Sequence, residues 1–343
     1  MRISSRLALV ALIVPVLFLA GEEHTAQATS YTRAYVNGRL VPVRFNDGDS
    51  FRIFAGEYSG RQCRLAGFNT LESFGPVHQW GDFHPYELFV NAKQATNHGK
   101  HGTWHCNTDG ETDVYGRILM DCPDLVVSQI RNGFAHAMNV DDTPSRPEYL
   151  RAQQEAIRER RGMWAHGVPA FVLTSLHSNH EDPERTKPTY NRLISTRDGH
   201  SEKWIHENDY GECEWVCYQE VVADEGLVRA YARRLREDPE VAPLLGELSN
   251  LLLVEIVDRW VRREELPAWL TEEEERASMM ESQGFNTDPR LAGLLTTRLE
   301  RAMSAGALGQ REVRQGSCAL YADFQRRYGR DRASCLRGRG TLP

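Results

Sequence analysis

Residues of types that could bind a metal ion and a phosphate gather between positions 46 and 117. They form four fragments separated by short, alternating apolar runs: Asp47-Gly48-Asp49-Ser50, Arg64-Leu65, Asn69-Thr70-Leu71-Glu72 and Asp113-Val114-Tyr115-Gly116-Arg117. Carboxylate, amide and carbonyl oxygens suit a hard divalent cation such as Ca²⁺. Planar guanidinium groups match phosphate oxygens and stabilise negative charge that grows in a transition state. These residue types together predict metal-assisted hydrolysis of a phosphodiester.

Each fragment, taken alone, also has a purely structural interpretation. Asp49 can belong to a turn, Arg64 can lie on a solvated strand face, and Glu72 can begin a helix. The segment Tyr115-Gly116-Arg117 can be a loop that precedes a strand. All four interpretations would have to hold together in one order along the chain, so we favour a shared chemical site.

Short strands and helices are expected to position these residues. Alternating apolar patterns and turn signals predict strands at 39–44, 50–54, 62–68, 103–106 and 117–122. Prolines and glycines at their ends predict helices at 85–97, 123–132 and 147–161. Five short strands with interspersed helices suit a small closed barrel of OB type. The prediction is an α+β fold with a five-stranded OB-type β-barrel and packed helices, in a domain at residues 29–170.

The same fragments resemble the staphylococcal nuclease, or thermonuclease, family over about Val41 to Trp164. Asp47-Gly48-Asp49, Arg64-Leu65, Thr70 with Glu72, and Asp113-x-Tyr115-Gly116-Arg117 occur in the family's order, and Arg161-Gly162-Met163-Trp164 is similar to its closing segment. The resemblance implies an OB-barrel nuclease that uses Ca²⁺ to cleave DNA or RNA. The expected partner is therefore a DNA or RNA substrate.

The resemblance also implies roles for individual residues. Asp49, Asn69 and the Thr70 carbonyl would be the metal ligands. Glu72 would be the general base, while Arg64 and Arg117 would be catalytic residues that bind the scissile phosphate. Tyr115 would touch a neighbouring phosphate of the substrate.

The chain departs from the family pattern at several of these places. Asn69 stands where the family usually has a second aspartate, which removes one negative charge and implies weaker binding of calcium. Leu71 replaces a proline, and Val114 replaces a common lysine. The segment 139–142 lacks the tyrosines that stack on a nucleotide base in well-known members.

The rest of the chain has a different character. Residues 171–205 are rich in polar residues and contain Pro183 and Pro188, so we predict a linker there. Beyond it, apolar residues recur at helical spacing, and residues 206–343 are predicted to form a separate all-α domain of unknown role. No protein partner of this domain can be named from its residues.

The first residues have the features of a secretory signal at 1–28. Arg2 and Arg6 precede an apolar stretch, and Ala26-Gln27-Ala28 supplies a small-residue cleavage pattern near Ala28. An uncleaved anchor is the alternative, although a membrane span needs roughly 20 apolar residues and Pro15 interrupts this stretch. We therefore expect a periplasmic or extracellular protein without stable membrane association after cleavage.

Export would permit disulfides among the seven cysteines. Cys106 and Cys122 are candidates for a bridge, although a simple hairpin register places Cys106 nearer Ile118. An odd count leaves at least one thiol unpaired within a monomer, and Cys63 is our candidate because it lies on an apolar strand face. The four cysteines after residue 200 allow three pairings.

Composition narrows the functions that remain. The hydrophobic content of 41% and charged content of 26% are ordinary for globular proteins. A net charge of −7 disfavours a stoichiometric nucleic-acid binder, which needs a strongly basic surface, but it is compatible with an enzyme. Two alternatives stay open: a catalytically weakened barrel that only binds, and a protein-interaction role carried by the helical domain.

Overall fold

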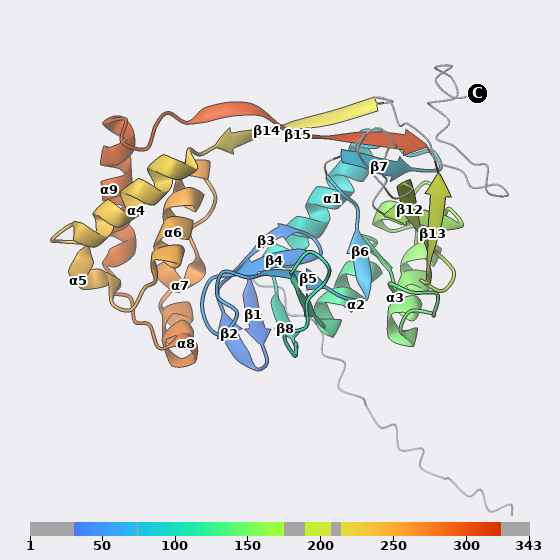
Figure 1. Ribbon diagram of the computed structural model, residues 1–343, viewed down its shortest axis with the longest axis horizontal. Helices are drawn as coiled ribbons and strands as arrows, with labels where there is room; N and C mark the ends of the chain where they lie inside the picture. The colour runs from blue at the N-terminus through green and yellow to red at the C-terminus, as the bar shows by residue number, and fades with distance from the viewer. Residues whose placement is uncertain (1–30, 74, 175–188, 207–213, 324–343) are drawn as a thin grey trace, which may run out of the picture.

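The computed structural model describes residues 31–73, 75–174, 189–206 and 214–323, and Figure 1 shows its elements. The fold is mixed α and β, as predicted. Its strands are β1 (Arg33–Val36), β2 (Arg39–Val41), β3 (Val43–Asp47), β4 (Ser50–Ile53), β5 (Gln62–Leu65), β6 (Phe68–Thr70), β7 (Gly75–Gln79), β8 (Thr103–Cys106), β9 (Ile118–Met120), β10 (Ala135–Ala137), β11 (Phe171–Thr174), β12 (Thr189–Ser195), β13 (Ser201–His206), β14 (Glu214–Val222) and β15 (Glu312–Asp323). Its helices are α1 (Pro85–Lys100), α2 (Pro123–Arg131), α3 (Pro147–Arg158), the 3₁₀ turn η1 (Gly162–Trp164), α4 (Glu225–Glu237), α5 (Ala242–Leu245), α6 (Asn250–Arg262), α7 (Ala268–Thr271), α8 (Glu273–Gln283) and α9 (Leu291–Ser304).

A four-stranded sheet with the order β3-β4-β5-β9 holds most of the predicted site residues. Side chains alternate between the two faces of a strand. Phe51, Ile53, Cys63, Leu65 and Ile118 point to the buried core. Cys63 is a free thiol, as predicted, and burial raises its pKa to about 12. The opposite face of this sheet carries polar side chains, and the candidate site lies on it.

The described strands do not close into the predicted five-stranded OB barrel. Two predicted strands are broken: Pro42 separates β2 from β3, and Ala66-Gly67 separates β5 from β6. Proline has no N–H to donate to a ladder, and Gly67 has a φ of 91°, which an extended strand cannot continue. As a result β2-β1-β8 and β10-β6 are separate small sheets beside the main one.

The predicted helices α1, α2 and α3 are present, and each has proline in its first turn. The missing N–H of proline costs nothing there, because that donor has no partner inside the helix. Gly133 follows α2 at a φ of 70°, and its carbonyl accepts a hydrogen bond from the Met163 N–H at 2.8 Å. A Cβ atom at this position would overlap the Arg161 carbonyl oxygen, so glycine lets η1 approach the helix end.

Two predictions for the second half of the chain are wrong. Residues 171–174 and 189–205 are not a linker, because β11, β12 and β13 form an antiparallel sheet there, with Leu193 and Ile194 buried, while 175–188 lie outside the described residues. The interval 206–343 is not all-α, because β14 and β15 pair with each other over most of their length. Their register places Cys217 opposite Cys318, while Cys213 and Cys335 lie outside the described residues.

The C-terminal helices also pack against the first part of the chain, so a separate helical domain is not confirmed. Leu40 and Phe54, from the N-terminal strands, belong to the hydrophobic cluster formed by α4, α6, α8 and α9. Arg44 on β3 donates to Asp258 at 2.8 Å and to Glu264 at 2.6 Å. In addition, β15 pairs in parallel with β7, as Figure 1 shows at the top of the molecule.

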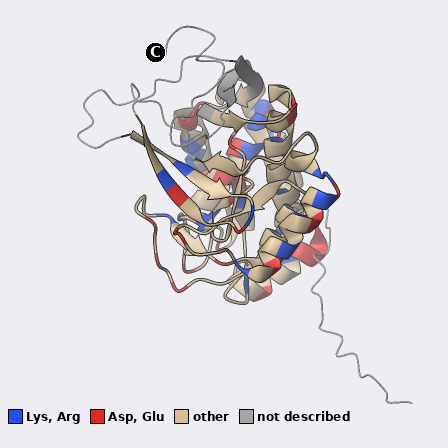
Figure 2. Ribbon diagram, turned by 90° about the vertical axis from the view of Figure 1, so that its right-hand side faces the viewer, with Lys and Arg blue, Asp and Glu red and all other residues tan. Residues whose placement is uncertain are grey.

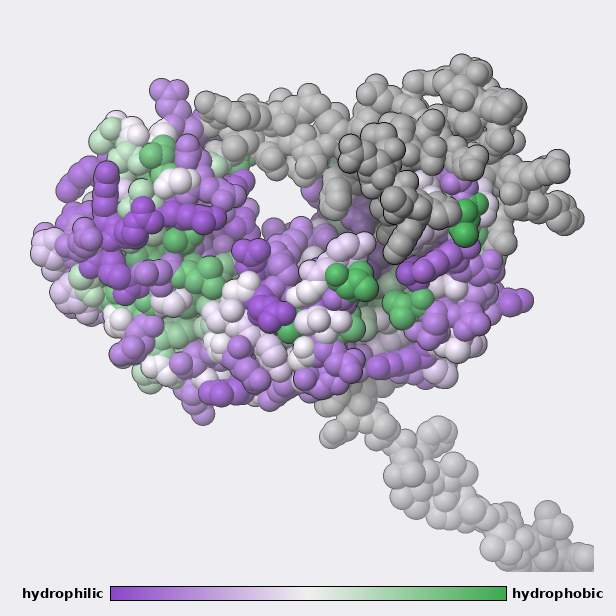
Figure 3. All heavy atoms as spheres, in the orientation of Figure 1, coloured by the Kyte–Doolittle hydropathy of each residue, from purple (hydrophilic) through white to green (hydrophobic). Residues whose placement is uncertain are grey.

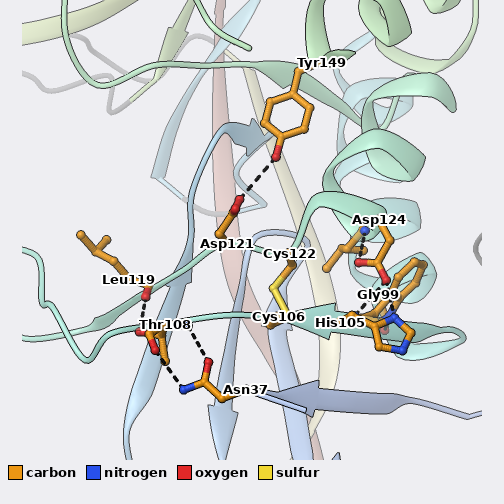
Figure 4. The surroundings of a disulfide bond; sticks show 12 residues. Asn37, Gly99, His105, Cys106, Thr108, Leu119, Asp121, Cys122, Asp124 and Tyr149 are labelled. Carbon is orange, nitrogen blue, oxygen red and sulfur yellow. Dashed lines mark hydrogen bonds and ion pairs between the residues drawn. A yellow bond between two sulfur atoms is a disulfide. The ribbon is translucent and has the colours of Figure 1, made fainter. Parts of the chain in front are cut away.

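Cys106 and Cys122 form a disulfide, which confirms the candidate pair (Figure 4). The simple hairpin register was wrong, because a β-bridge pairs Asn107 with Asp121 and another pairs Thr112 with Ile118. The loop between Asn107 and Asp121 is longer than a tight turn. Because these two residues are paired, the residues next to them, Cys106 and Cys122, lie opposite each other. Around the bridge, Asn37 and Thr108 exchange two hydrogen bonds of 2.9 Å.

We expect the double substitution Cys106→Ala and Cys122→Ala to lower the free energy of unfolding by about 3 kcal/mol. The bridge spans 16 positions, and closing a loop of that length removes entropy from the unfolded chain. Urea unfolding with and without dithiothreitol measures the effect. Reductant should destabilise the unmodified protein by a similar amount and change the double variant much less. Equal stabilities of the oxidised protein and the double variant would contradict this expectation.

The predicted signal at 1–28 lies outside the described residues. Within the part of the chain that is described, no helix has the length and apolar content to cross a bilayer. Figure 2 shows Lys and Arg interspersed with Asp and Glu along the helices of one side, not gathered in a single basic patch. The charge distribution on that side agrees with the argument against a counterion-releasing nucleic-acid binder.

Candidate active site

Two rows of polar side chains cross the outer face of the main sheet. Strand register places Asp47 opposite Ser50 and Ser50 opposite Arg64. The neighbouring row joins Arg44, Arg52 and Gln62 by the same pairings. Because Cys63 pairs with Ile118 in parallel, the preceding residues Gln62 and Arg117 extend that row onto the edge strand. Arg64 and Arg117 therefore lie on one face of one sheet.

Asp49 and Asn69 converge on a single cationic group. One guanidinium nitrogen of Arg64 forms an ion pair with Asp49 Oδ1, and the other donates to Asn69 Oδ1 at 2.6 Å. The second Asp49 oxygen accepts from the Thr70 N–H at 2.9 Å and from the Thr70 hydroxyl at 3.2 Å. Asp49, Asn69 and Thr70 are all buried, so these hydrogen bonds form in an environment with little water.

Asp47 adds a second carboxylate to this cluster. Its Oδ1 accepts hydrogen bonds from the Ser50 hydroxyl at 2.7 Å and from the Asp49 N–H at 3.2 Å. Burial, and then the charge of Asp49, raise the pKa of Asp47 to about 7. The sequence suggests only a turn at Asp47-Gly48, so the electrostatic role of Asp47 was missed.

Glu72 lies in the electrostatic field of the same groups. Burial, and then the charges of Asp49 and Asp47, raise the pKa of its carboxyl to about 8, while Arg64 and Arg117 act in the opposite direction. Three carboxyl groups thus share one region with two arginines, and Arg64 is already paired. An additional positive charge would be accommodated favourably at this place.

Arg117 is held at the rim of the site by Asp113. Its Nε donates to Asp113 Oδ2 at 2.7 Å, and its backbone N–H donates to Asp113 Oδ1 at 3.0 Å. Although burial acts the other way, these hydrogen bonds lower the pKa of Asp113. The Tyr115 ring is exposed, and the Arg117 guanidinium lies 5.4 Å from its centre. Tyr115 therefore faces solvent beside Arg117, where it can contact a bound ligand.

The donor set fits a hard divalent cation. Oxygens of Asp49 and Asn69 already share one positive partner, Arg64, and carboxylate and amide oxygens are suitable ligands for Ca²⁺. The third predicted ligand, the Thr70 carbonyl, accepts a hydrogen bond from Asn69 Nδ2 at 2.6 Å. Within the described ranges no three His, Cys, Asp or Glu side chains form a metal-binding group. A cation here would therefore depend on amide and carbonyl oxygens as well as carboxylates.

His136, which lies beneath this cluster, was not predicted from the sequence. It sits on β10 opposite Asn69 and is buried. Its Nε2 has no hydrogen-bond partner among the described residues, and its Nδ1 lies 3.3 Å from the Ala137 carbonyl oxygen. Burial lowers its pKa to about 4, so the ring is neutral near pH 7. In the sequence it is one polar residue in an apolar run, a pattern also produced by a core histidine.

Searches against protein-family models and against curated proteins find no match for this chain. The interpretation of the site therefore depends on its residues and their geometry.

Proposed function

We propose that the chain is an exported, Ca²⁺-assisted nuclease that hydrolyses phosphodiester bonds of DNA or RNA. The observation that supports this proposal most directly is the convergence of Asp49 and Asn69 on one cationic group, on the sheet face that also bears Arg117. The sequence resemblance to staphylococcal nucleases points to the same chemistry. We infer that the main sheet and the β10-β6 pair take the place of the family's OB barrel.

The residues have distinct parts in the proposed reaction. Asp49, Asn69 and the Thr70 carbonyl would hold the cation, which when bound would polarise a phosphoryl oxygen and help to position water. Glu72, in its carboxylate form, accepts a proton from the attacking water as a P–O bond forms; the bond to the leaving oxygen breaks, and that oxygen keeps the bonding electron pair and takes a proton from solvent. Arg117, together with Arg64, stabilises the negative charge on the phosphoryl oxygens.

A catalytically weakened binding module is the second candidate, and one observation favours it. Arg64 is engaged by Asp49 and Asn69, so a phosphate must compete with both for its guanidinium. If the phosphate does not displace Asp49 and Asn69 from Arg64, the site can bind a polynucleotide at its rim through Arg117 and Tyr115 without cleaving it.

Cleavage assays with Glu72→Gln distinguish these candidates. With calcium, we expect the mature protein to cut denatured DNA or RNA, and we expect EDTA to abolish the products. Glu72→Gln keeps the shape but removes the base, and should lower the rate by about 10²–10⁴-fold. Glu57→Gln, at an exposed position away from the site, is the matched control and should leave the rate unchanged.

The results of these assays distinguish a nuclease from a binding module. A protein that produces no calcium-dependent products but binds an oligonucleotide is the binding module. A Glu72→Gln variant that cleaves at the full rate would show that another residue is the base.

A further inference from the structure

We infer that the outer face of the main sheet continues from the active site into a groove that holds a single-stranded polynucleotide, with α4 as its far wall. This inference rests on the proposed function and deepens it. It assigns the C-terminal helices a part in binding the substrate beyond the scissile bond.

The first step is the row of side chains next to Arg64. Arg44, Arg52 and Gln62 are register partners on adjacent strands, and Arg117 directly precedes β9, whose Ile118 pairs with the residue after Gln62. Neighbouring strands are about 4.8 Å apart, so this row extends roughly 14 Å from the rim of the site. A strand bound at Arg117 can therefore follow the row across the sheet without leaving its surface.

The second step is the groove at the end of that row. A hollow of about 760 Å³ is lined by Asn46, Arg52 and Gln62 from the sheet and by Arg229 and Arg233 from α4. Asp49, Glu72 and Arg117 do not line it, so it is an extension of the site and not the site itself. A second hollow of about 580 Å³ shares Asn46 and Arg44 with it and reaches Lys93 on α1.

The charges of the groove favour an anionic ligand. Five arginines and three carboxylates line it. Arg44 and Arg262 are held by Asp258, and Arg229 pairs with Glu225. Arg233 is exposed and makes no hydrogen bond or ion pair with the described residues. The Arg52 guanidinium lies 2.9 Å from the Gln62 side-chain amide and forms no ion pair with a carboxylate of the described residues.

A polynucleotide fits these features better than an acidic protein does. Stable protein interfaces need apolar or aromatic anchors. Of the apolar residues that line the groove, Phe54, Val228 and Ala232 are buried in the helical core, and Leu251 and Val254 are half-buried against it. The left part of Figure 3, where the helices lie, shows hydrophilic residues interspersed with hydrophobic ones on its visible face. A groove that tracks a phosphate backbone needs spaced cations more than an apolar patch.

The test compares long and short strands in the full mature protein. We would measure binding of fluorescein-labelled oligothymidylates of about 30 and about 6 nucleotides in EDTA, over a range of salt concentrations. The double variant Arg52→Gln and Arg233→Gln should bind the long strand at least about tenfold more weakly, with a salt slope lower by about 1.4. The short strand, which the site alone can hold, should lose much less. Arg301→Gln, an exposed arginine on α9, is the matched control.

Each outcome bears on the inference separately from the proposed catalysis. If the double variant lost equal affinity for long and short strands, or if its salt slope were unchanged, the proposal that the groove binds a polynucleotide would be wrong. Equal competition by polyglutamate at the same charge concentration would indicate an acidic protein ligand and would also overturn it. If the length dependence appears but no phosphodiester is ever cleaved, the groove stands and the nuclease activity fails.

Discussion

Arg117→Ala is expected to lower kcat/KM for polynucleotide cleavage by about 10³–10⁵-fold, the range seen when an arginine that stabilises a phosphoryl transition state is removed. Arg117 is partly exposed at the rim of the sheet and points its guanidinium toward Asp113 and Tyr115. Unlike Arg64, it has no bond to the candidate metal ligands. A phosphate at the rim therefore competes only with Asp113 for the Arg117 guanidinium.

Arg117→Lys and Arg151→Ala sharpen this prediction. The lysine keeps the charge without the planar fork, so it should recover only part of the loss. Arg151 is an exposed arginine on α3, and its replacement should leave cleavage unchanged. The Asp113 carboxylate still accepts the Tyr115 N–H at 2.9 Å in the variant, so thermal unfolding should change little. An Arg117→Ala rate within about threefold of the unmodified protein would remove Arg117 from the mechanism.

Arg44→Met is expected to lower the free energy of unfolding by about 3 kcal/mol. Although burial opposes its charged form, Glu255, Asp258 and Glu264 together raise the pKa of Arg44, so it stays protonated at every accessible pH. Breaking a buried ion pair leaves charges without compensation, at a cost of about 3–5 kcal/mol. The lower figure applies here because Arg259 still pairs with Glu255.

Urea unfolding at neutral and acid pH measures this effect. Acid protonates the carboxylates that Arg44 would have neutralised, so the difference between variant and unmodified protein should shrink as the pH falls. Glu264→Gln removes the most exposed partner and should cost less than about 1 kcal/mol. If Arg44→Met were as stable as the unmodified protein, the helices would not be anchored through this residue.

Sequence signals within a few residues of each other correctly predicted the helices whose ends depend on such local interactions. Proline at the first turn of α1, α2 and α3 placed these helices correctly. Strands β12 and β13 were missed because their buried positions include Thr189, Asn191 and His206, so no apolar alternation appears. A buried polar strand has the same composition as a polar linker.

The candidate site likewise contains some features that the sequence predicted and others that it did not. Motif order predicted that Asp49, Arg64, Asn69 and Thr70 lie together, and they do. The sequence motif did not predict that the Arg64 guanidinium forms an ion pair with Asp49. Which carboxylate an arginine pairs with depends on the three-dimensional positions of all the nearby charges. Contacts such as Arg44 with Glu255, 211 positions apart in the chain, leave no periodic signal that a sequence pattern could reveal.

The parallel pairing of β7 with β15 has a consequence for how the protein becomes active. The first of these strands begins at Gly75, close after Glu72, and the second ends at Asp323. During synthesis the early strand must wait for its neighbour until the polypeptide has been made as far as Asp323. Polypeptides cut short before that point would leave the segment after the proposed base without its edge partner, so the proposed hydrolase would mature only once β15 has been synthesised.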